Sequence, residues 1–225
     1  MSETGTENTP KAYRRPKEPT NFITYAVAAL LAFVGFALLL SCSLINASPS
    51  LGRYAVFLFV AAVVFTVGAL CHILPASSMA GEVCRKLDRC AVPVLIAGAF
   101  FPVMFSAFGA GTSTDAIWGY TLFAIIAVAT VCVAAVSVAN VAEYKIICLV
   151  FYVVIGWACV ARAHRIVDLC GWGSFWALFG GGAAYFTGAI VGALEGMPAR
   201  HAFKHILVIV GAAAHCAGIY LFLMS

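Results

Sequence analysis

The sequence predicts an all-α, polytopic membrane protein in which seven transmembrane helices form one bundle. Hydrophobic residues make up 64% of the chain, charged residues only 10%, and the mean hydropathy is +1.03. A water-soluble domain of this size needs much more polar surface, so the apolar excess is expected to face lipid. A helix crosses a bilayer core of about 30 Å with about 20 residues. Seven such helices with short loops therefore use nearly all 225 residues.

The first twenty residues are expected to form a disordered, basic cytoplasmic tail, and residues 21–225 the seven-helix domain. The tail combines three prolines with four Lys and Arg residues and has no apolar run. Its charges precede a full-length span instead of the short apolar region of a signal peptide. We therefore interpret it as a tail and not as a targeting sequence.

Seven apolar segments follow the tail. The fifth is the shortest and is expected to borrow flanking residues to reach the length of a span. Glycines 180–182, 188 and 192 lie in the sixth segment, where small residues favour close helix packing in lipid. The segments are 22–44, 54–74, 90–108, 116–138, 146–161, 174–194 and 201–223.

The distribution of basic residues predicts the orientation of the bundle. If the amino terminus is inside, ten of the thirteen Lys and Arg residues fall on the inner side, and only Arg53, Arg162 and Arg165 on the outer side. Lys and Arg concentrate in cytoplasmic loops. We therefore expect a cytoplasmic amino terminus and an outer carboxyl terminus, in the plasma membrane or an endomembrane.

The small net charge of +4 and the absence of a basic patch with interleaved aromatic residues argue against nucleic acid as a partner. Membrane lipids are the expected partners. A lipid substrate or ligand inside the bundle is the corresponding functional expectation.

Four polar residues with suitable chemistry are expected at the inner ends of three spans. His72 ends the second segment, Asp88 opens the third, and His201 and His205 open the seventh. Histidines four residues apart share one helix face, and a third imidazole would complete the His₃ set of a catalytic zinc site. Ionisable residues in spans generally face the bundle interior. Asp88 would then orient or deprotonate a water molecule activated by Zn²⁺.

Other interpretations of these residues stay open. The histidines at 201 and 205 are also suited to hydrogen bonds between helices, and Asp88 to a salt bridge within a basic loop over residues 85–89. His215, about 15 Å along the helix from His205, is expected to pack or hydrogen-bond. His164 lies beside two arginines and is expected at the outer interface.

Residues 18–224 resemble the haemolysin III family, which is related to the progestin and adipoQ receptors, including the adiponectin receptors. The resemblance implies a seven-helix bundle with a cytoplasmic amino terminus, and zinc held by the residues matching His72, His201 and His205. It implies that Asp88 contacts a water on the metal. The matching pieces are Glu18-Pro-Thr-Asn21, His72, Arg85-Lys-Leu-Asp88, Leu95-Ile-Ala-Gly98 with Pro102, and Arg200-His-Ala-Phe-Lys-His205 with His215.

The resemblance extends to several functions. The wider superfamily includes alkaline ceramidases, so zinc-dependent hydrolysis of a lipid amide or ester is one expected activity. The alternatives are a receptor-like or membrane-remodelling protein with structural zinc, and a pore-forming or lytic protein. Polar residues are sparse in the spans, which gives little support to a conducting pore.

Two positions depart from the family pattern. Gly68 stands where the family usually has a serine, four residues before the second-span histidine. Tyr25 stands where the family usually has a histidine, after the threonine at 24. The missing serine removes a hydroxyl that would polarise a carbonyl or hold a water. Metal binding is still expected, while the question of whether the chain is an enzyme stays open.

Overall fold

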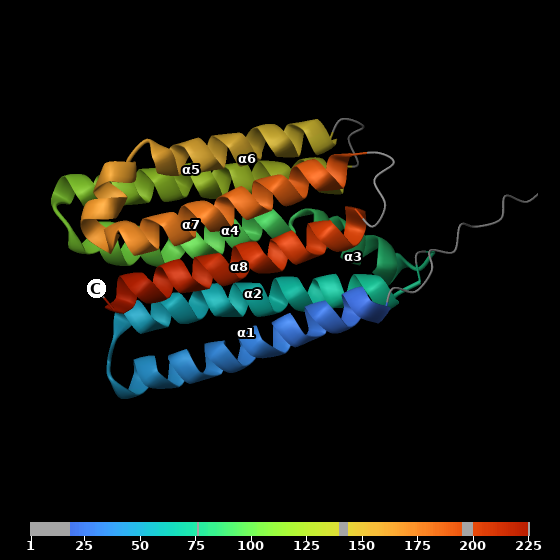
Figure 1. Cartoon of the computed structure of the whole chain (residues 1–225), viewed down its shortest axis with the longest axis horizontal. Helices are drawn as coiled ribbons and strands as arrows, with labels where there is room; N and C mark the ends of the chain where they lie inside the picture. Colours follow the sequence, from blue (N-terminus) through green and yellow to red (C-terminus); the bar gives the residue numbers. More distant parts are fainter. Residues whose placement is uncertain (1–18, 76, 140–143, 195–199, 225) are drawn as a thin grey trace, which may run out of the picture.

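The computed structural model describes residues 19–75, 77–139, 144–194 and 200–224, and most of their side chains. Almost all of the predicted tail, residues 1–18, lies outside this part of the chain. Within it, all regular secondary structure is helical, as predicted. The helices lie side by side in one bundle (Figure 1). They are α1 (Pro19–Ile45), α2 (Pro49–Ile73), α3 (Met79–Arg89), α4 (Ala91–Pro102), η1 (Val103–Phe108), α5 (Ser113–Val138), α6 (Tyr144–Val160), α7 (Ala163–Ala193) and α8 (Arg200–Met224).

Each expected apolar segment coincides with helix. In the described residues, six helical units are long and apolar enough to cross a membrane: α1, α2, α4 with η1, α5, α7 and α8. The shortest segment is again the fifth, because α6 has only 17 residues. These lengths and compositions are those of a multi-pass membrane protein.

The third span lies at the centre of the bundle. Its residues Leu95, Ala99 and Val103 have no exposed surface, and α4 packs against α2, α5 and α8. The first span, in contrast, lies at the edge of the bundle and is largely exposed. Leu30, Leu31 and other large apolar side chains of α1 are exposed. Exposed apolar surface of this extent needs a lipid environment.

Local sequence signals explain where several helices begin and bend. Pro49 lies in the first turn of α2, where its missing N–H is not needed. Pro102 lacks the N–H that an α-helix requires, and the π-helix η1 begins directly after it. Arg53 of α2 donates hydrogen bonds from Nη1 to the Phe105 carbonyl oxygen at 2.8 Å and to Ser106 Oγ at 3.1 Å, which ties α2 to η1.

The basic loop expected at residues 85–89 is instead the second half of the helix α3. Ser78 caps this helix by accepting a hydrogen bond from the Gly81 N–H. The hydrogen bond and charge of Lys86, at 2.9 Å, lower the pKa of the Glu82 carboxyl below its ordinary value. Met79, Val83 and Leu87 form an exposed apolar stripe at helical spacing. This pattern is typical of a helix that lies in the membrane interface.

Helix α7 begins at Ala163, well before the expected position 174. The apolar pattern underestimates it because its first turns carry His164, Arg165 and Asp168. The helix bends at Gly171, whose φ of 78° is accessible to glycine at little cost.

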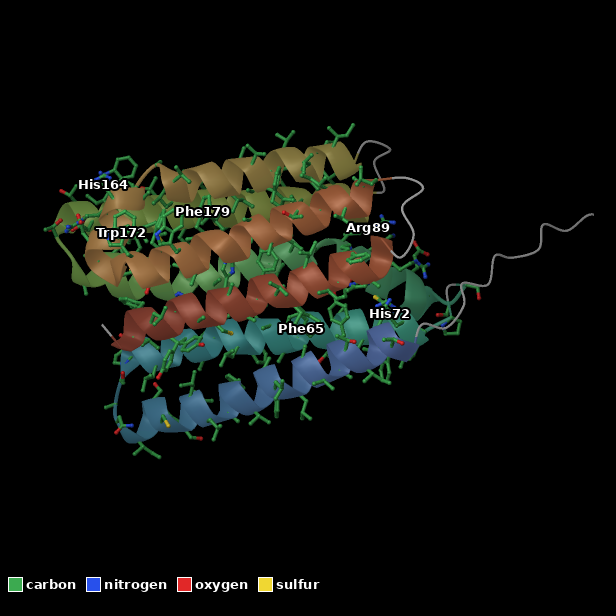
Figure 2. All side chains as sticks on the ribbon, viewed as in Figure 1. Phe65, His72, Arg89, His164, Trp172 and Phe179 are labelled. Carbon is green, nitrogen blue, oxygen red and sulfur yellow. The ribbon has the colours of Figure 1, made fainter. Side chains whose placement is uncertain are left out.

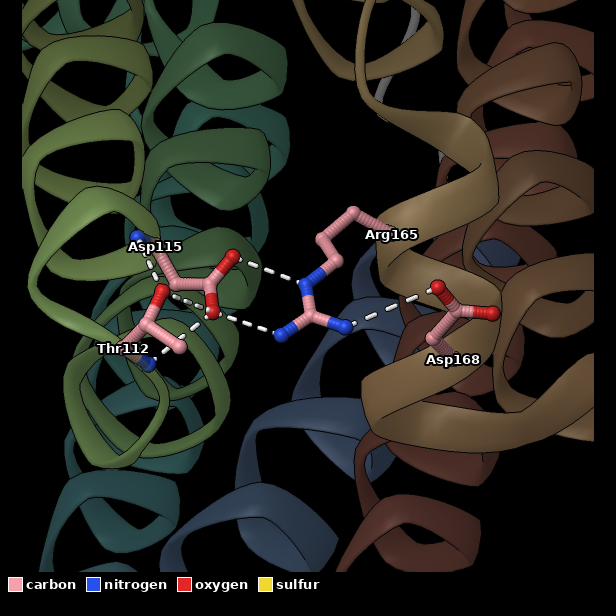
Figure 3. Close-up of polar contacts among 4 residues, drawn as sticks. All are labelled: Thr112, Asp115, Arg165 and Asp168. Carbon is pink, nitrogen blue, oxygen red and sulfur yellow. Dashed lines mark hydrogen bonds and ion pairs between the residues drawn. The ribbon is translucent and has the colours of Figure 1, made fainter.

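An ion-pair cluster joins the start of α7 to the start of α5 (Figure 3). Arg165 donates from Nε to Asp115 Oδ1 at 2.7 Å and from Nη2 to Asp115 Oδ2 at 2.6 Å. Asp115 also forms a capping box with Thr112 at the start of α5. Arg162 lies over the ring of Trp118 at 4.7 Å. These contacts hold α5 and α7 together at one end of the bundle.

Candidate metal centre

Three helices bring polar rings together at the opposite end of the bundle. His72 lies in the last turn of α2, His205 lies near the start of α8, and Tyr25 lies near the start of α1. Because α2 runs toward this end and α1 and α8 start from it, segments far apart in the sequence meet there. Figure 2 shows His72 at the same end of the bundle as α3, far from His164.

The two histidines predicted on different helices are neighbours. The ring centroids of His72 and His205 are 4.9 Å apart, with an interplanar angle of 80°. His205 is buried and His72 is half-buried. Imidazoles this close, from separate helices, are near enough to share a metal ion.

Tyr25 completes the group of rings. Its ring lies 4.7 Å from that of His205 and 6.0 Å from that of His72. Its hydroxyl is hydrogen-bonded to Nδ1 of His205. Which of the two atoms donates depends on the imidazole tautomer. Sequence reasoning recorded Tyr25 only as a departure from the family pattern and did not place it in the site.

Asp88 lies on α3 at the same end of the bundle but is paired with a cation. Lys204 Nζ is 3.7 Å from Asp88 Oδ2, which links α3 to the start of α8. Among the described side chains, no group of three or more His, Cys, Asp and Glu residues is placed to hold a metal ion. Asp88 therefore does not complete a set with His72 and His205.

The side chain of His201 lies outside the described part of the chain. The backbone of α8 places position 201 one helical turn before His205. The third predicted ligand is therefore untested.

His215 packs and forms a hydrogen bond, as expected from sequence. His215 is fully buried, and its Nε2 donates to the Leu178 carbonyl oxygen at 3.1 Å. Its ring also packs edge-on against Tyr185 at 5.1 Å. His164 is exposed at the far end of the bundle (Figure 2), and its place at the outer membrane interface stays a prediction.

A family model described as haemolysin-III related matches residues 13–216. The chain belongs to the haemolysin-III related family. The match covers most of the chain, so this haemolysin-III relative is an integral, multi-pass membrane protein.

The arrangement of the described residues fits a zinc ion in one respect. Metal-binding histidines generally hydrogen-bond through their second ring nitrogen to a fixed partner. His205 has such a partner on Nδ1, which makes Nε2 the nitrogen suited to a metal. His72 lies beside it, and residue 201 is on the same helix. These residues are therefore chemically suited to hold Zn²⁺.

An apolar cavity of about 480 Å³ lies between α4, α6 and α7. Phe100, Tyr152, Phe179 and Tyr185 are among its lining residues. Tyr185 packs closely against Gly211 of α8, six residues beyond His205. Six residues of helix correspond to about 9 Å, so the cavity wall begins within about two turns of the histidines.

Proposed function

We infer that this haemolysin-III relative binds zinc near the inner leaflet, with His72, His201 and His205 as ligands. The observation that supports this most is the 4.9 Å contact between the rings of His72 and His205. A shared ion would tie the end of α2 to the start of α8. In this proposal the bundle has seven spans, with its amino terminus in the cytoplasm and its carboxyl terminus outside.

The first candidate activity is hydrolysis of a membrane lipid amide or ester. When bound, zinc acts as a Lewis acid and lowers the pKa of water to about 7. Asp88 would accept a proton from the attacking water, and Lys204 would position its carboxylate. The water oxygen bonds to the carbonyl carbon, the C–N or C–O bond breaks, and the leaving group takes up a proton.

The apolar cavity supports a lipid as the molecule bound. Its lining is dominated by aromatic and aliphatic side chains, which suits acyl chains. Its wall approaches the level of His205 through the contact of Tyr185 with Gly211. A lipid seated there would have its polar part nearer to the histidines than its chain ends.

The second candidate function is a receptor-like or membrane-remodelling protein with structural zinc. Two observations favour it. Asp88 is occupied by an ion pair with Lys204, and position 68 offers no hydroxyl. In this case the metal would hold α2 and α8 together while a lipid binds without being cleaved.

Elemental analysis of purified protein tests the zinc site. We expect about one zinc per chain in the wild type, and loss of most of it in His72→Ala and in His205→Ala. His164→Ala is the matched control, because this histidine lies at the other end of the bundle, and it should retain its zinc. A wild type free of zinc, or variants that keep it, would contradict the proposal.

Mass spectrometry of lipids incubated with the zinc-loaded protein separates the two functions. Hydrolysis predicts a free fatty acid that disappears in Asp88→Asn although zinc is retained. A structural metal predicts no product from the wild type, together with a lower Tm after zinc is removed by a chelator.

A further inference from the structure

We propose that Tyr25 is a positioning residue of the histidine site, and that Gly68 is a glycine because the Tyr25 ring occupies its side-chain space. The hydroxyl of Tyr25 would fix the ring orientation of His205 toward a metal. The metal-binding part of this inference rests on the proposed zinc site.

Tyr25 is directed inward from a helix whose other side chains mostly face outward. It is 3% exposed, whereas Ile23 and Val27 are 58% and 51% exposed. Its ring is enclosed by Phe65 at 5.6 Å and by the two histidines. A large aromatic ring that α1 sends into the interior contacts both histidines of the candidate site.

The hydrogen bond between the Tyr25 hydroxyl and His205 Nδ1 specifies how His205 would bind a cation. A neutral imidazole that binds a metal through Nε2 carries its proton on Nδ1. That N–H would donate to the Tyr25 oxygen, which serves as the fixed outer partner. Because both residues are 3% exposed, neither ring is free to turn without repacking its neighbours.

The space at residue 68 is matched to the Tyr25 ring. A Cβ atom added to Gly68 would lie 3.0 Å from both Cδ1 and Cε1 of Tyr25. The ring has little room to retreat, because Phe65 and His205 lie against it. Residues 25 and 68 are therefore coupled by size, because the ring at 25 fills the space that a side chain at 68 would need.

Zinc affinity measured by competition with a chromophoric chelator tests the role of the hydroxyl. Tyr25→Phe keeps the ring but removes its buried hydrogen bond to His205, so we expect a modest fall in the Tm of the metal-free protein. We expect zinc affinity to be lowered about tenfold or more. The absorption spectrum of bound Co²⁺ should also shift, because the orientation of one ligand changes. The control is Tyr220→Phe, whose ring is exposed on the same helix as His205, and it should change neither property.

The outcomes separate this inference from the proposed function. If the wild type binds zinc and Tyr25→Phe binds it equally, with the same Co²⁺ spectrum, the positioning role is overturned while the zinc site stands. If the wild type takes up no zinc, the site itself fails, and the positioning role fails with it.

A double-mutant cycle tests the coupling of residues 25 and 68 without any metal. Gly68→Ala should lower the Tm of the wild type, because its methyl group meets the Tyr25 ring. The same substitution made in Tyr25→Ala should leave the Tm unchanged or raise it, since the space is vacant and alanine favours helix over glycine. Equal Tm shifts in the two backgrounds would overturn the coupling.

Discussion

Lys204, which is adjacent to His205 in the sequence, forms an ion pair with Asp88. Their charged atoms are 3.7 Å apart, and both side chains are partly exposed. A pair of this length and exposure contributes little to stability. Its effect is mainly to place a carboxylate beside the start of α8.

Replacement of Lys204 by Gln therefore has a small expected effect on the fold. The free energy of unfolding should change by about 1 kcal/mol or less, and zinc content should stay at the wild-type level. Thermal unfolding in detergent and elemental analysis measure the two quantities. A loss of zinc as large as that of His205→Ala would mean that Lys204 supports the metal directly.

Residue-level prediction from sequence placed His72 and His205 at one end of the bundle, where their rings are 4.9 Å apart. Their role as metal ligands stays a prediction. Prediction from sequence failed for Tyr25, because an aromatic residue in an apolar span is usually packing or lipid-facing, and nothing in the spacing shows which face it occupies. The small residue at 68 and the large ring at 25 match in size. This match can be recognised only once α1 and α2 are known to pack against each other.

At the scale of elements, α7 and α8 form a close pair whose contact depends on particular glycines. A Cβ atom on Gly181 would lie 2.3 Å from Cδ2 of His215, and one on Gly188 would lie 3.3 Å from Cβ of Leu207. Gly180 and Gly182 have nothing within 4 Å of such an atom. The predicted role of the glycines in close packing is confirmed for Gly181 and Gly188, and is wrong for Gly180 and Gly182.

The substitutions Gly181→Ala and Gly180→Ala should therefore have opposite effects on the stability of the protein. Gly181→Ala inserts a methyl group against a buried imidazole and should destabilise the protein by about 1–3 kcal/mol. Gly180→Ala meets no neighbour and should be neutral or stabilise by up to about 1 kcal/mol through helix propensity. Thermal unfolding of both variants checks this. Equal destabilisation would contradict the packing described.

Helix α3 shows why elements of this kind are difficult to recognise. It has eleven residues, too few for a span, and charges at 82, 85, 86, 88 and 89. If apolar runs are the only pattern considered, a short segment with so many charges is predicted to be a solvated loop. The spacing of Met79, Val83 and Leu87 was the available indication of a helix. The long spans were predictable because each is a nearly uninterrupted apolar run.

At the scale of the whole molecule, different chemistry holds the two ends of the bundle. One end has His72 and His205 with Tyr25, together with the Asp88–Lys204 pair. The other has the buried Asp115 joined to Arg165 (Figures 2 and 3). The central third span contributes packing alone along most of its length.

The Asp115–Arg165 contact should be a main support of the far end. Arg165→Ala would leave the Asp115 carboxylate, which is 3% exposed, without the two hydrogen bonds from the guanidinium. We expect the Tm to fall by several degrees. Asp168→Asn is the control, because that carboxylate is exposed and 3.6 Å from the guanidinium, and its Tm should be nearly unchanged. Equal effects would show that the bidentate pair is not the dominant contact.

The proposed orientation is testable on intact cells. Epitope tags at the two termini should differ in antibody access, with the carboxyl-terminal tag detected outside and the amino-terminal tag only after permeabilisation. This follows from the excess of Lys and Arg on the side of the predicted bundle where His72 and His205 lie, since Lys and Arg concentrate in cytoplasmic loops. Tags on the same side would require an even number of spans, and α6 would then be the helix that does not cross.

X-ray absorption spectroscopy at the zinc edge of the purified protein tests the central claim most directly. The account predicts zinc with imidazole nitrogen ligands at about 2.0–2.1 Å, and loss of this signal in His72→Ala and His205→Ala. Zinc surrounded by sulfur at about 2.3 Å would assign the metal to cysteines. That result, or a spectrum unaffected by either substitution, would contradict a metal shared between α2 and α8.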